Sequence, residues 1–206
     1  MLHSPPHQFK AKTIDVCQIL QEYKLGKRDF SEINLAQTSL TDVRLTNVKF
    51  WRANLAKMNF SRTDLRGVDL SESNLAAATL WRTNLDKSNL SQANCSGAFF
   101  ICANLKGANL YQSKLCDAEM RLASLVSANL RQVDLSGANL SYADLRFADL
   151  TGANLRGAIL TGANLMETNI DDSNIDEAIV SSVSRVDLSQ AKFSNSRVGY
   201  NVLAIN

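Results

Sequence analysis

Few side chains in this sequence are suited to acid–base, nucleophilic or metal chemistry. His3 and His7 are the only histidines, and both flank a Ser-Pro-Pro segment whose composition is typical of a disordered arm. Asp and Asn are abundant, but they recur every five residues and lack the D-x-D-x-D-G spacing of a calcium loop. No glycine-rich phosphate loop joins a long strand to a helix. The sequence therefore predicts no enzyme, no cofactor and no metal site.

The four cysteines form no C-x-x-C pair and no regular disulfide framework, so we expect reduced thiols. Cys95 falls at an apolar position of the repeat described below, which predicts an inert core residue, whereas Cys102 and Cys116 fall in predicted turns. Residues 1–12 contain no apolar segment of a secretory signal, and no run approaches the roughly 18 apolar residues that span a membrane. We expect a cytoplasmic protein without a membrane partner.

A five-residue repeat dominates the chain and determines where every other side chain lies. From Phe30 to Val180 every fifth residue is apolar, and leucine occupies 22 of these 31 positions. Two residues before each of them stands alanine in 16 cases and serine or threonine in eight. The residue between the two is Asn or Asp in 21 cases. The repeating unit is therefore Ala-(Asn/Asp)-Leu-x-x.

A period of five fits neither an α-helix nor a long strand, but it fits a very short strand followed by a two-residue turn. The small residue and the leucine then share the inward face, and the Asn or Asp points outward. Seven of the nine glycines occupy the second turn position, where a permissive backbone is favourable. These features predict an all-β solenoid with the leucines along its axis.

The units A-N-L-K-G at 103–107, A-D-L-R-F at 143–147 and A-N-L-R-G at 153–157 resemble the pentapeptide-repeat proteins. The resemblance extends over about 150 of the 206 residues. It implies a right-handed quadrilateral β-helix with four sides, 20 residues per coil and about eight coils. Residues 23–30 also look like the helix-to-repeat junction of cyanobacterial members of that family.

The N-terminal region is divided into a disordered arm, residues 1–12, and a helical cap, residues 13–29. Thr13 is the predicted N-cap and Gly26 suits the helix end. A helix here would cover the first coil, because an open solenoid end exposes apolar core and unpaired backbone. The face that would lie on the core consists of Val16, Ile19, Leu20 and Tyr23.

The repeat β-helix is predicted over residues 30–180, and residues 181–206 are predicted to form a loop and a C-terminal coil or cap. The apolar residues of that last segment either close the core or form a dimer interface, since the resemblance implies C-terminal dimers in some members. A monomer and a C-terminal homodimer both remain open.

One predicted side of the solenoid carries apolar residues where the other sides carry Asn, Asp, Ser or Gly. Isolated apolar surface residues are ordinary, but a cluster bordered by arginine indicates a binding surface. Trp51 and Tyr111 lie on a different side and carry no such prediction. The candidate partner-binding face consists of Trp81, Arg82, Phe99, Ile101, Arg121, Leu122, Tyr142 and Ile159.

The net charge of +2 predicts no strong binding of nucleic acid through bulk charge. We predict a non-enzymatic protein–protein interaction scaffold with a regulatory role, and the resemblance extends that role to cyanobacterial cell differentiation or signalling. The alternative is a DNA mimic that binds DNA gyrase or topoisomerase, as some pentapeptide-repeat proteins do. Those rods are strongly acidic, whereas residues 1–109 here hold 14 basic and nine acidic residues. The identity of the protein partner stays open.

Overall fold

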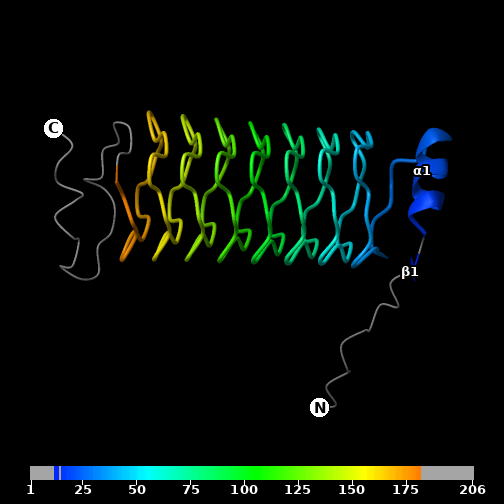
Figure 1. The fold of residues 1–206 in the computed structure, drawn as a ribbon, viewed down its shortest axis with the longest axis horizontal. Coiled ribbons are helices and arrows are strands. Elements are labelled where there is room, and N and C mark those ends of the chain that lie inside the picture. The colour runs from blue at the N-terminus through cyan, green and yellow to red at the C-terminus, as the bar shows by residue number, and fades with distance from the viewer. Residues whose placement is uncertain (1–11, 14, 182–206) are drawn as a thin grey trace, which may run out of the picture.

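The computed structural model describes residues 12–13 and 15–181, which form a straight rod of stacked coils with a short helix at one end (Figure 1). The named elements are β1 (Lys12–Thr13), α1 (Val16–Lys24) and β2 (Ile33–Asn34). After β2 the coils are joined by single-residue β-bridges, because each side of a coil is too short to form a longer strand. No helix among these residues is long and apolar enough to cross a membrane.

Every bridge between coils joins two parallel residues that are 20 apart in the sequence, which gives each coil four five-residue sides. Backbone hydrogen bonds run in both directions across each contact: Leu55 N–H donates to Asn74 O at 2.7 Å, and Asn74 N–H donates to Ala53 O at 2.9 Å. We name the four sides after the first outward residue of each, in chain order: the Asp29, Asn34, Ser39 and Arg44 sides. The Asp29 side is opposite the Ser39 side, and the Asn34 side is opposite the Arg44 side.

The rod is solid, because the large apolar residues fill its axis and the small residues beside them are buried too. Phenylalanines concentrate near the N-terminal end, where the ring centroids of Phe30 and Phe50 are 6.1 Å apart. Each large side chain contributes roughly 1.5–3 kcal/mol of gross burial free energy. Burial raises the pKa of the Cys95 thiol to about 12, consistent with the inert core residue predicted for it.

A positive φ at the second turn position recurs throughout the repeats. Ala53 N–H donates to Phe50 O at 3.0 Å across the turn, and Arg52 at the second turn position has φ of 52°. A positive φ at that position indicates a type II turn. Arginine, lysine, glutamine and even tyrosine adopt it here, so the backbone does not depend on glycine. No valine, isoleucine or threonine occupies this position between 32 and 177, because branching at Cβ is least tolerated at positive φ.

The N-terminal end differs from the prediction in where the helix begins. Thr13 pairs with Asn34 in the parallel contact between β1 and β2, so it is not the N-cap. Asp15 is the N-cap, and its carboxylate accepts from the Cys17 backbone N–H at 3.4 Å. Lys12, predicted to belong to the arm, pairs with Ile33 in the same contact. Residues 1–11 lie outside the described residues.

Helix α1 lies across the N-terminal end of the rod (Figure 1). Ile19 is fully buried in the core, and Val16, Leu20 and Tyr23 pack against it, so these four residues form the apolar face expected of them. Gly26, with φ of 97°, follows the helix as the predicted stop. The helix therefore buries apolar surface that the first coil would otherwise expose.

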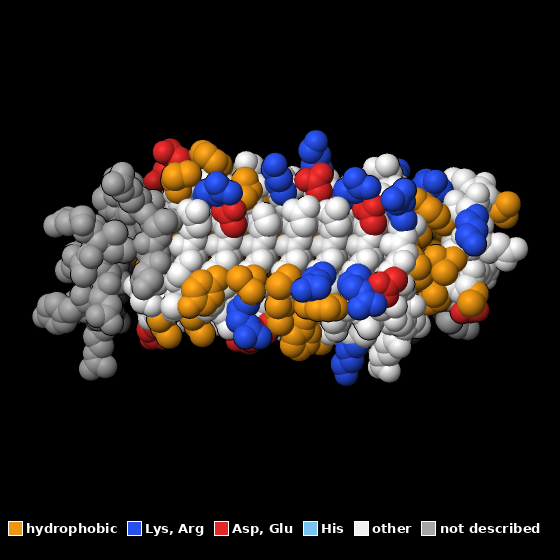
Figure 2. Space-filling view, turned by 45° about the horizontal axis from the view of Figure 1, so that its top comes forward, with side chains coloured by type: hydrophobic (Ala, Val, Ile, Leu, Met, Phe, Trp, Pro, Cys, Tyr) orange, Lys and Arg blue, Asp and Glu red, His pale blue; other side chains and the backbone are white. Residues whose placement is uncertain are grey.

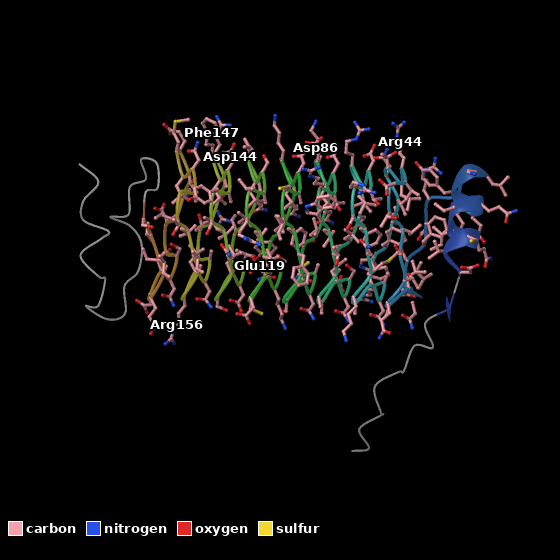
Figure 3. The ribbon with its side chains drawn as sticks, viewed as in Figure 1. Arg44, Asp86, Glu119, Asp144, Phe147 and Arg156 are labelled. Carbon is pink, nitrogen blue, oxygen red and sulfur yellow. The ribbon has the colours of Figure 1, made fainter. Side chains whose placement is uncertain are left out.

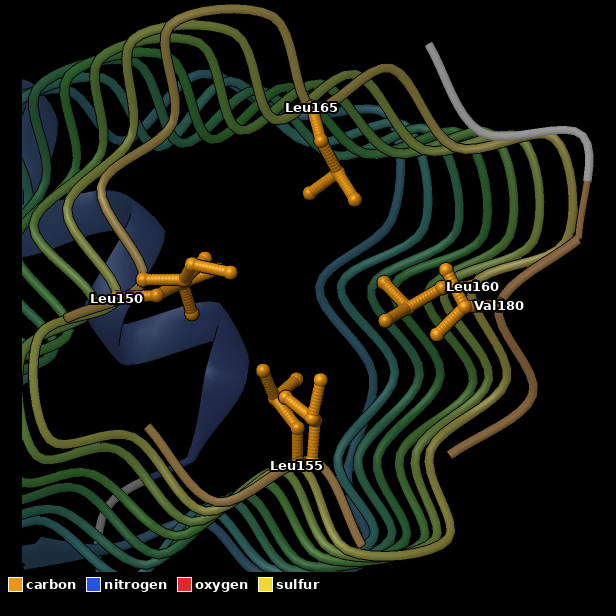
Figure 4. Close-up of a pocket in the computed structure, with 7 residues that line it drawn as sticks. Leu150, Leu155, Leu160, Leu165 and Val180 are labelled. Atoms are coloured by element: carbon orange, nitrogen blue, oxygen red, sulfur yellow. The ribbon is translucent and has the colours of Figure 1, made fainter. Parts of the chain in front are cut away.

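The core remains apolar to its last described coil. Leu150, Leu155, Leu160 and Leu165 point inward from the four sides and, with Ile170, Ile175 and Val180, line a small pocket where the axis reaches the last described coils (Figure 4). The predicted loop, terminal coil and dimer interface fall almost entirely in residues 182–206, outside the described part of the chain.

Candidate partner-binding surface

The Asn34 side shows how an outward residue is used when the surface only supports the fold. The amides of Asn54 and Asn74 each donate to the asparagine of the preceding coil, at 3.0 Å and 3.3 Å, and Asn94 donates to Asn74 at 3.4 Å. Each Asn oxygen also accepts from a backbone N–H two residues later, as Asn74 does from Ala76 at 3.2 Å. The asparagines thus fix the turn and join the coils, and much of their hydrogen-bonding capacity is used within the protein.

The Asp29 side, opposite the candidate face, is similarly self-contained. Its asparagine ladder runs through Asn109 and Asn129, whose side chains are joined at 2.9 Å. Trp51 donates to the Glu72 carboxylate at 3.2 Å, and Tyr111 donates to Gln132 at 3.3 Å. Both aromatic residues are half-buried and held by neighbouring coils, which supports leaving them out of the candidate face.

The Ser39 side departs from this pattern from the middle of the rod to its last described coil. Its outward column contains Phe99, Ile159 and Ile179, none of which can accept from the backbone or extend an amide ladder. Phe99 and Ile179 are 43% and 52% exposed. Apolar side chains here are therefore present without a role in joining the coils.

All eight residues of the candidate face lie on the Ser39 side or on the corner that follows it. Arg82, Phe99, Arg121, Leu122 and Tyr142 are exposed, and Trp81, Ile101 and Ile159 are half-buried. Figure 2 shows the result as a row of hydrophobic side chains along the lower edge of the rod, with Lys and Arg side chains towards its N-terminal part. We call the corner residues Trp81, Ile101, Leu122 and Tyr142 the Trp81 row.

Arginines hold the N-terminal part of this row in place. The Arg62 and Arg82 guanidinium carbons lie 5.8 Å and 4.8 Å from the centre of the Trp81 ring, within cation–π range. Arg62 is also bound by both oxygens of Asp42, at 2.6 Å and 2.5 Å. This hydrogen bonding holds the pKa of the Asp42 carboxyl below its ordinary value, so the pair is ionised at neutral pH.

A charged pair interrupts the apolar surface near its middle. Arg121 donates to Glu119 at 3.1 Å, and the Asn139 amide donates to the same carboxylate at 3.3 Å. Because the charges are paired side by side, they add polar specificity to the surface without adding net charge.

Tyr142 extends the Trp81 row towards the C-terminal end. Its ring edge lies 2.6 Å from where a Cβ of Gly162 would stand, so the ring covers the next coil. Tyr142 is 63% exposed despite this contact, and its φ of 59° places a bulky side chain in the left-handed region. Glycine at 162 is what permits the ring to lie flat there.

Sequence reasoning missed a second group of exposed apolar residues, on the corner that follows the Arg44 side. Phe147 and Met166 are 53% and 40% exposed, and Val126 is half-buried beside them. Phe147 lies on the upper edge of the rod, well away from Glu119 (Figure 3). The sequence could have shown this group, because positions 20 apart stack and these residues occupy the two turn positions after the Arg44 side in three successive coils.

Groups suited to catalysis are not brought together in residues 12–13 and 15–181. No cluster of three or more His, Cys, Asp or Glu side chains in this part could hold a metal ion. Cys102 and Cys116 are half-buried on different sides, and the Cys116 sulfur contacts the Ser96 hydroxyl at 3.1 Å. His3 and His7 lie outside the described residues.

Two family models match most of the repeat region. The model described as a pentapeptide repeat region matches residues 20–90, and the model for eight copies of the pentapeptide repeat matches residues 103–141 and 143–181. The chain belongs to the pentapeptide-repeat family. No curated protein sequence matches this family member.

Several solved structures are similar to this pentapeptide-repeat protein. HetL, described as involved in heterocyst differentiation regulation in the cyanobacterium Nostoc, is 25% identical with a TM-score of 0.43, covering 86% of this chain and 96% of HetL. Rfr23 from the cyanobacterium Cyanothece is 26% identical with a TM-score of 0.36, covering 84% and 100%. QnrB1, a plasmid-mediated fluoroquinolone resistance protein, is 15% identical with a TM-score of 0.37, covering 81% and 92%.

Proposed function

We propose that this pentapeptide-repeat protein is a non-enzymatic scaffold that binds another protein through its Ser39 side. The observation that carries the proposal is the replacement of the outward ladder by Phe99, Ile159 and Ile179. On the Asn34 and Asp29 sides, outward asparagines join the coils, so their presence needs no partner. Exposed apolar side chains give no such benefit to the folded chain, but they supply binding free energy when a partner covers them.

The shape of the surface also suits protein recognition. Backbone hydrogen bonds tie each coil to the next, so a partner would meet side chains already fixed in position, and little conformational entropy would be lost on binding. Trp81 between two arginines and Tyr142 over Gly162 are the residue types that dominate protein interfaces.

A regulatory, cytoplasmic role, in cyanobacterial cell differentiation or signalling, is the finer form of this proposal. It is supported by the absence of a catalytic constellation in the described residues and by the regulatory description of HetL. The partner would then be a regulatory protein rather than a substrate.

The test is affinity capture from the source cell extract with three forms of the protein side by side. The triple variant Trp81→Ala/Phe99→Ala/Tyr142→Ala removes the largest side chains of the candidate face. The matched control is Trp51→Ala/Tyr111→Ala, which removes two aromatic residues from the opposite side. A protein retained by the wild type and the control but lost with the triple variant supports the proposal. Equal capture by all three, with circular dichroism showing all three folded, rejects it.

DNA mimicry with binding to DNA gyrase or topoisomerase is the second candidate. It is favoured by residues 110–180, which hold five basic and ten acidic residues, four of the acids falling between 171 and 177. The N-terminal coils oppose it, because cations stand there and neutral asparagines occupy much of the outward surface. Gyrase supercoiling that proceeds unchanged in the presence of excess protein would eliminate this candidate.

A further inference from the structure

The Arg44 side is bordered by apolar residues on both of its long edges. The Trp81 row precedes it in each coil, and Val126, Phe147 and Met166 follow it. Figure 2 shows a band of white atoms along the rod, with coloured side chains on both of its edges. The outward residues of that band are half-buried and polar: Asn84, Asn104, Ser124, Asp144 and Asn164.

The two edges are apolar over the same three coils. Leu122 faces Val126 across the first of them, and Tyr142 faces Phe147 across the second. In the third, the Tyr142 ring covers Gly162 and so stands opposite Met166. An element lying along this side would therefore have apolar contacts on both flanks.

The two preceding coils carry positive charge on the same edges. Arg82, Lys87 and Lys106 stand there, and none of them has a carboxylate within ion-pair distance among the described residues. By contrast, Asp64 is bound by Arg66 at 2.8 Å, and Asp144 is bound by Arg146 at 2.8 Å. Asp64 and Asp144 are thus neutralised by neighbouring arginines. Asp86 stands beside Lys87 without an ion pair among the described residues, so Arg82, Asp86, Lys87 and Lys106 together leave a net positive charge for an acidic partner.

The spacing of the coils favours an α-helix over an extended peptide as the occupant. Adjacent coils are about 4.8 Å apart, and an α-helix advances about 5.4 Å per turn. Three coils are separated by two steps, over which the helix and the coils drift apart by about 1.2 Å, so successive helical turns meet successive coils. Side chains on one face of a strand are about 6.6 Å apart, so over the same two steps they drift by about 3.6 Å, most of one coil spacing.

We propose that the Arg44 side binds an amphipathic α-helix of a partner protein, with acidic residues over Arg82, Lys87 and Lys106 and apolar residues between Tyr142 and Phe147. This inference rests on the proposed function and names the kind of segment that the partner supplies. The shared Trp81 row makes the interface continuous across the corner from the Ser39 side.

The experiment selects ligands from a displayed library of random 18-residue peptides on the wild-type protein. The expected enriched sequences are helix-forming, with Asp or Glu at one end and apolar residues spaced three and four apart at the other. Enrichment of basic or proline-rich extended peptides would overturn the proposal, and so would failure to enrich any family of sequences.

Variants then locate the binding of the most enriched peptide, measured by fluorescence anisotropy. We expect Lys87→Glu/Lys106→Glu and Phe147→Ala/Met166→Ala each to weaken binding by about tenfold or more. The matched control Lys57→Glu/Lys114→Glu makes the same charge change on the opposite, Asn34 side, and should change the dissociation constant less than about twofold. Equal weakening by the control would show nonspecific charge attraction and reject the site.

The outcomes separate this inference from the proposed function. If cellular capture depends on Trp81, Phe99 and Tyr142 while the lysine and Phe147 variants bind as well as the wild type, the protein is a scaffold but its Arg44 side receives no helix. If sedimentation shows that the wild type dimerises and that Phe147→Ala/Met166→Ala abolishes the dimer, the occupant is a second copy of the chain and the helix proposal fails.

Discussion

The Asn34 side and the Ser39 side are built on the same backbone and the same inward residues, yet they present different surfaces. On the Asn34 side, asparagines 20 apart bind one another and the turns. On the Ser39 side, Phe99 and Ile159 stand at the equivalent outward position, and the coils stack equally well. The inward columns and the backbone bonds are therefore sufficient for the coil, and the outward column is free to change for binding.

The largest effect is expected from breaking the inward column. Leu140 is fully buried, so Leu140→Ala should lower the free energy of unfolding by about 2–5 kcal/mol through lost burial and a residual cavity. Urea unfolding followed by circular dichroism measures it. Tyr142→Ala, in the same coil but outward, should change stability by less than about 0.5 kcal/mol. A comparable loss for Tyr142→Ala would contradict the division between inward and outward residues.

A smaller loss is expected from interrupting the ladder of the Asn34 side. Asn74→Leu removes two side-chain hydrogen bonds to neighbouring coils and leaves the Ala76 N–H without its acceptor. We expect a loss of about 1–3 kcal/mol in the same unfolding measurement. The counterpart on the Ser39 side is Phe99→Leu, which should be close to neutral because the Phe99 side chain makes no hydrogen bond to a neighbouring coil. Equal effects would mean that the asparagines do not support the fold.

The loss of folding stability at acid pH should depend on the Arg44 side and not on the neutral asparagine ladder of the Asn34 side. Hydrogen bonds from Arg66 and Arg146 lower the pKa values of Asp64 and Asp144 below their ordinary 3.8. Each pair therefore stabilises the fold above about pH 4, by up to about 1 kcal/mol, and this contribution is lost as the pH falls through the lowered pKa. Asp64→Asn/Asp144→Asn should lose less stability than the wild type between pH 7 and pH 3. A parallel decline would assign the acid sensitivity to other groups.

The smallest effect is expected from converting the Ser39 side to the ladder type. In Ile159→Asn, the new amide can donate to Asn139 and its oxygen can accept from the Thr161 N–H, as at Asn74. Stability should stay equal or rise by about 0.5 kcal/mol, while capture of a partner through this side should weaken. Thermal denaturation measures the change in stability, and the capture assay measures the change in partner binding. A clear loss of stability would show that Ile159 has a structural role.

Much of the architecture could be predicted from the sequence, because the same pattern of apolar and small residues recurs in every repeat. Leucine every fifth residue, with alanine two residues before it, determines both the inward face and the turn. The predicted N-cap was wrong because Thr13 suits a cap locally, whereas its pairing with Asn34 depends on a residue 21 positions away. The sequence showed glycine at seven second turn positions, and the structure shows that most of the other second turn positions hold non-glycine residues at the same positive φ.

The surface was predicted less completely, because its meaning depends on stacking across coils. The eight candidate residues do share a corner and a side, since positions 20 apart coincide. Trp81 and Ile159 are half-buried and not fully exposed, because neighbouring side chains cover part of them. The double hydrogen bonding of the asparagines and the edge formed by Phe147 and Met166 appear only when three successive coils are seen together.

Each coil consists of four five-residue units, and this has a consequence for how such proteins diversify. Removing one unit, such as residues 151–155, would leave the inward columns continuous, but it would carry every later residue to the preceding side. Ile159 would then stand on the Asn34 side. Loss or gain of five residues is thus a quarter-turn of the downstream surface about the axis, and loss or gain of 20 residues is a shift by one coil. Insertion or deletion of single five-residue units can therefore rearrange a binding surface while the core stays unchanged.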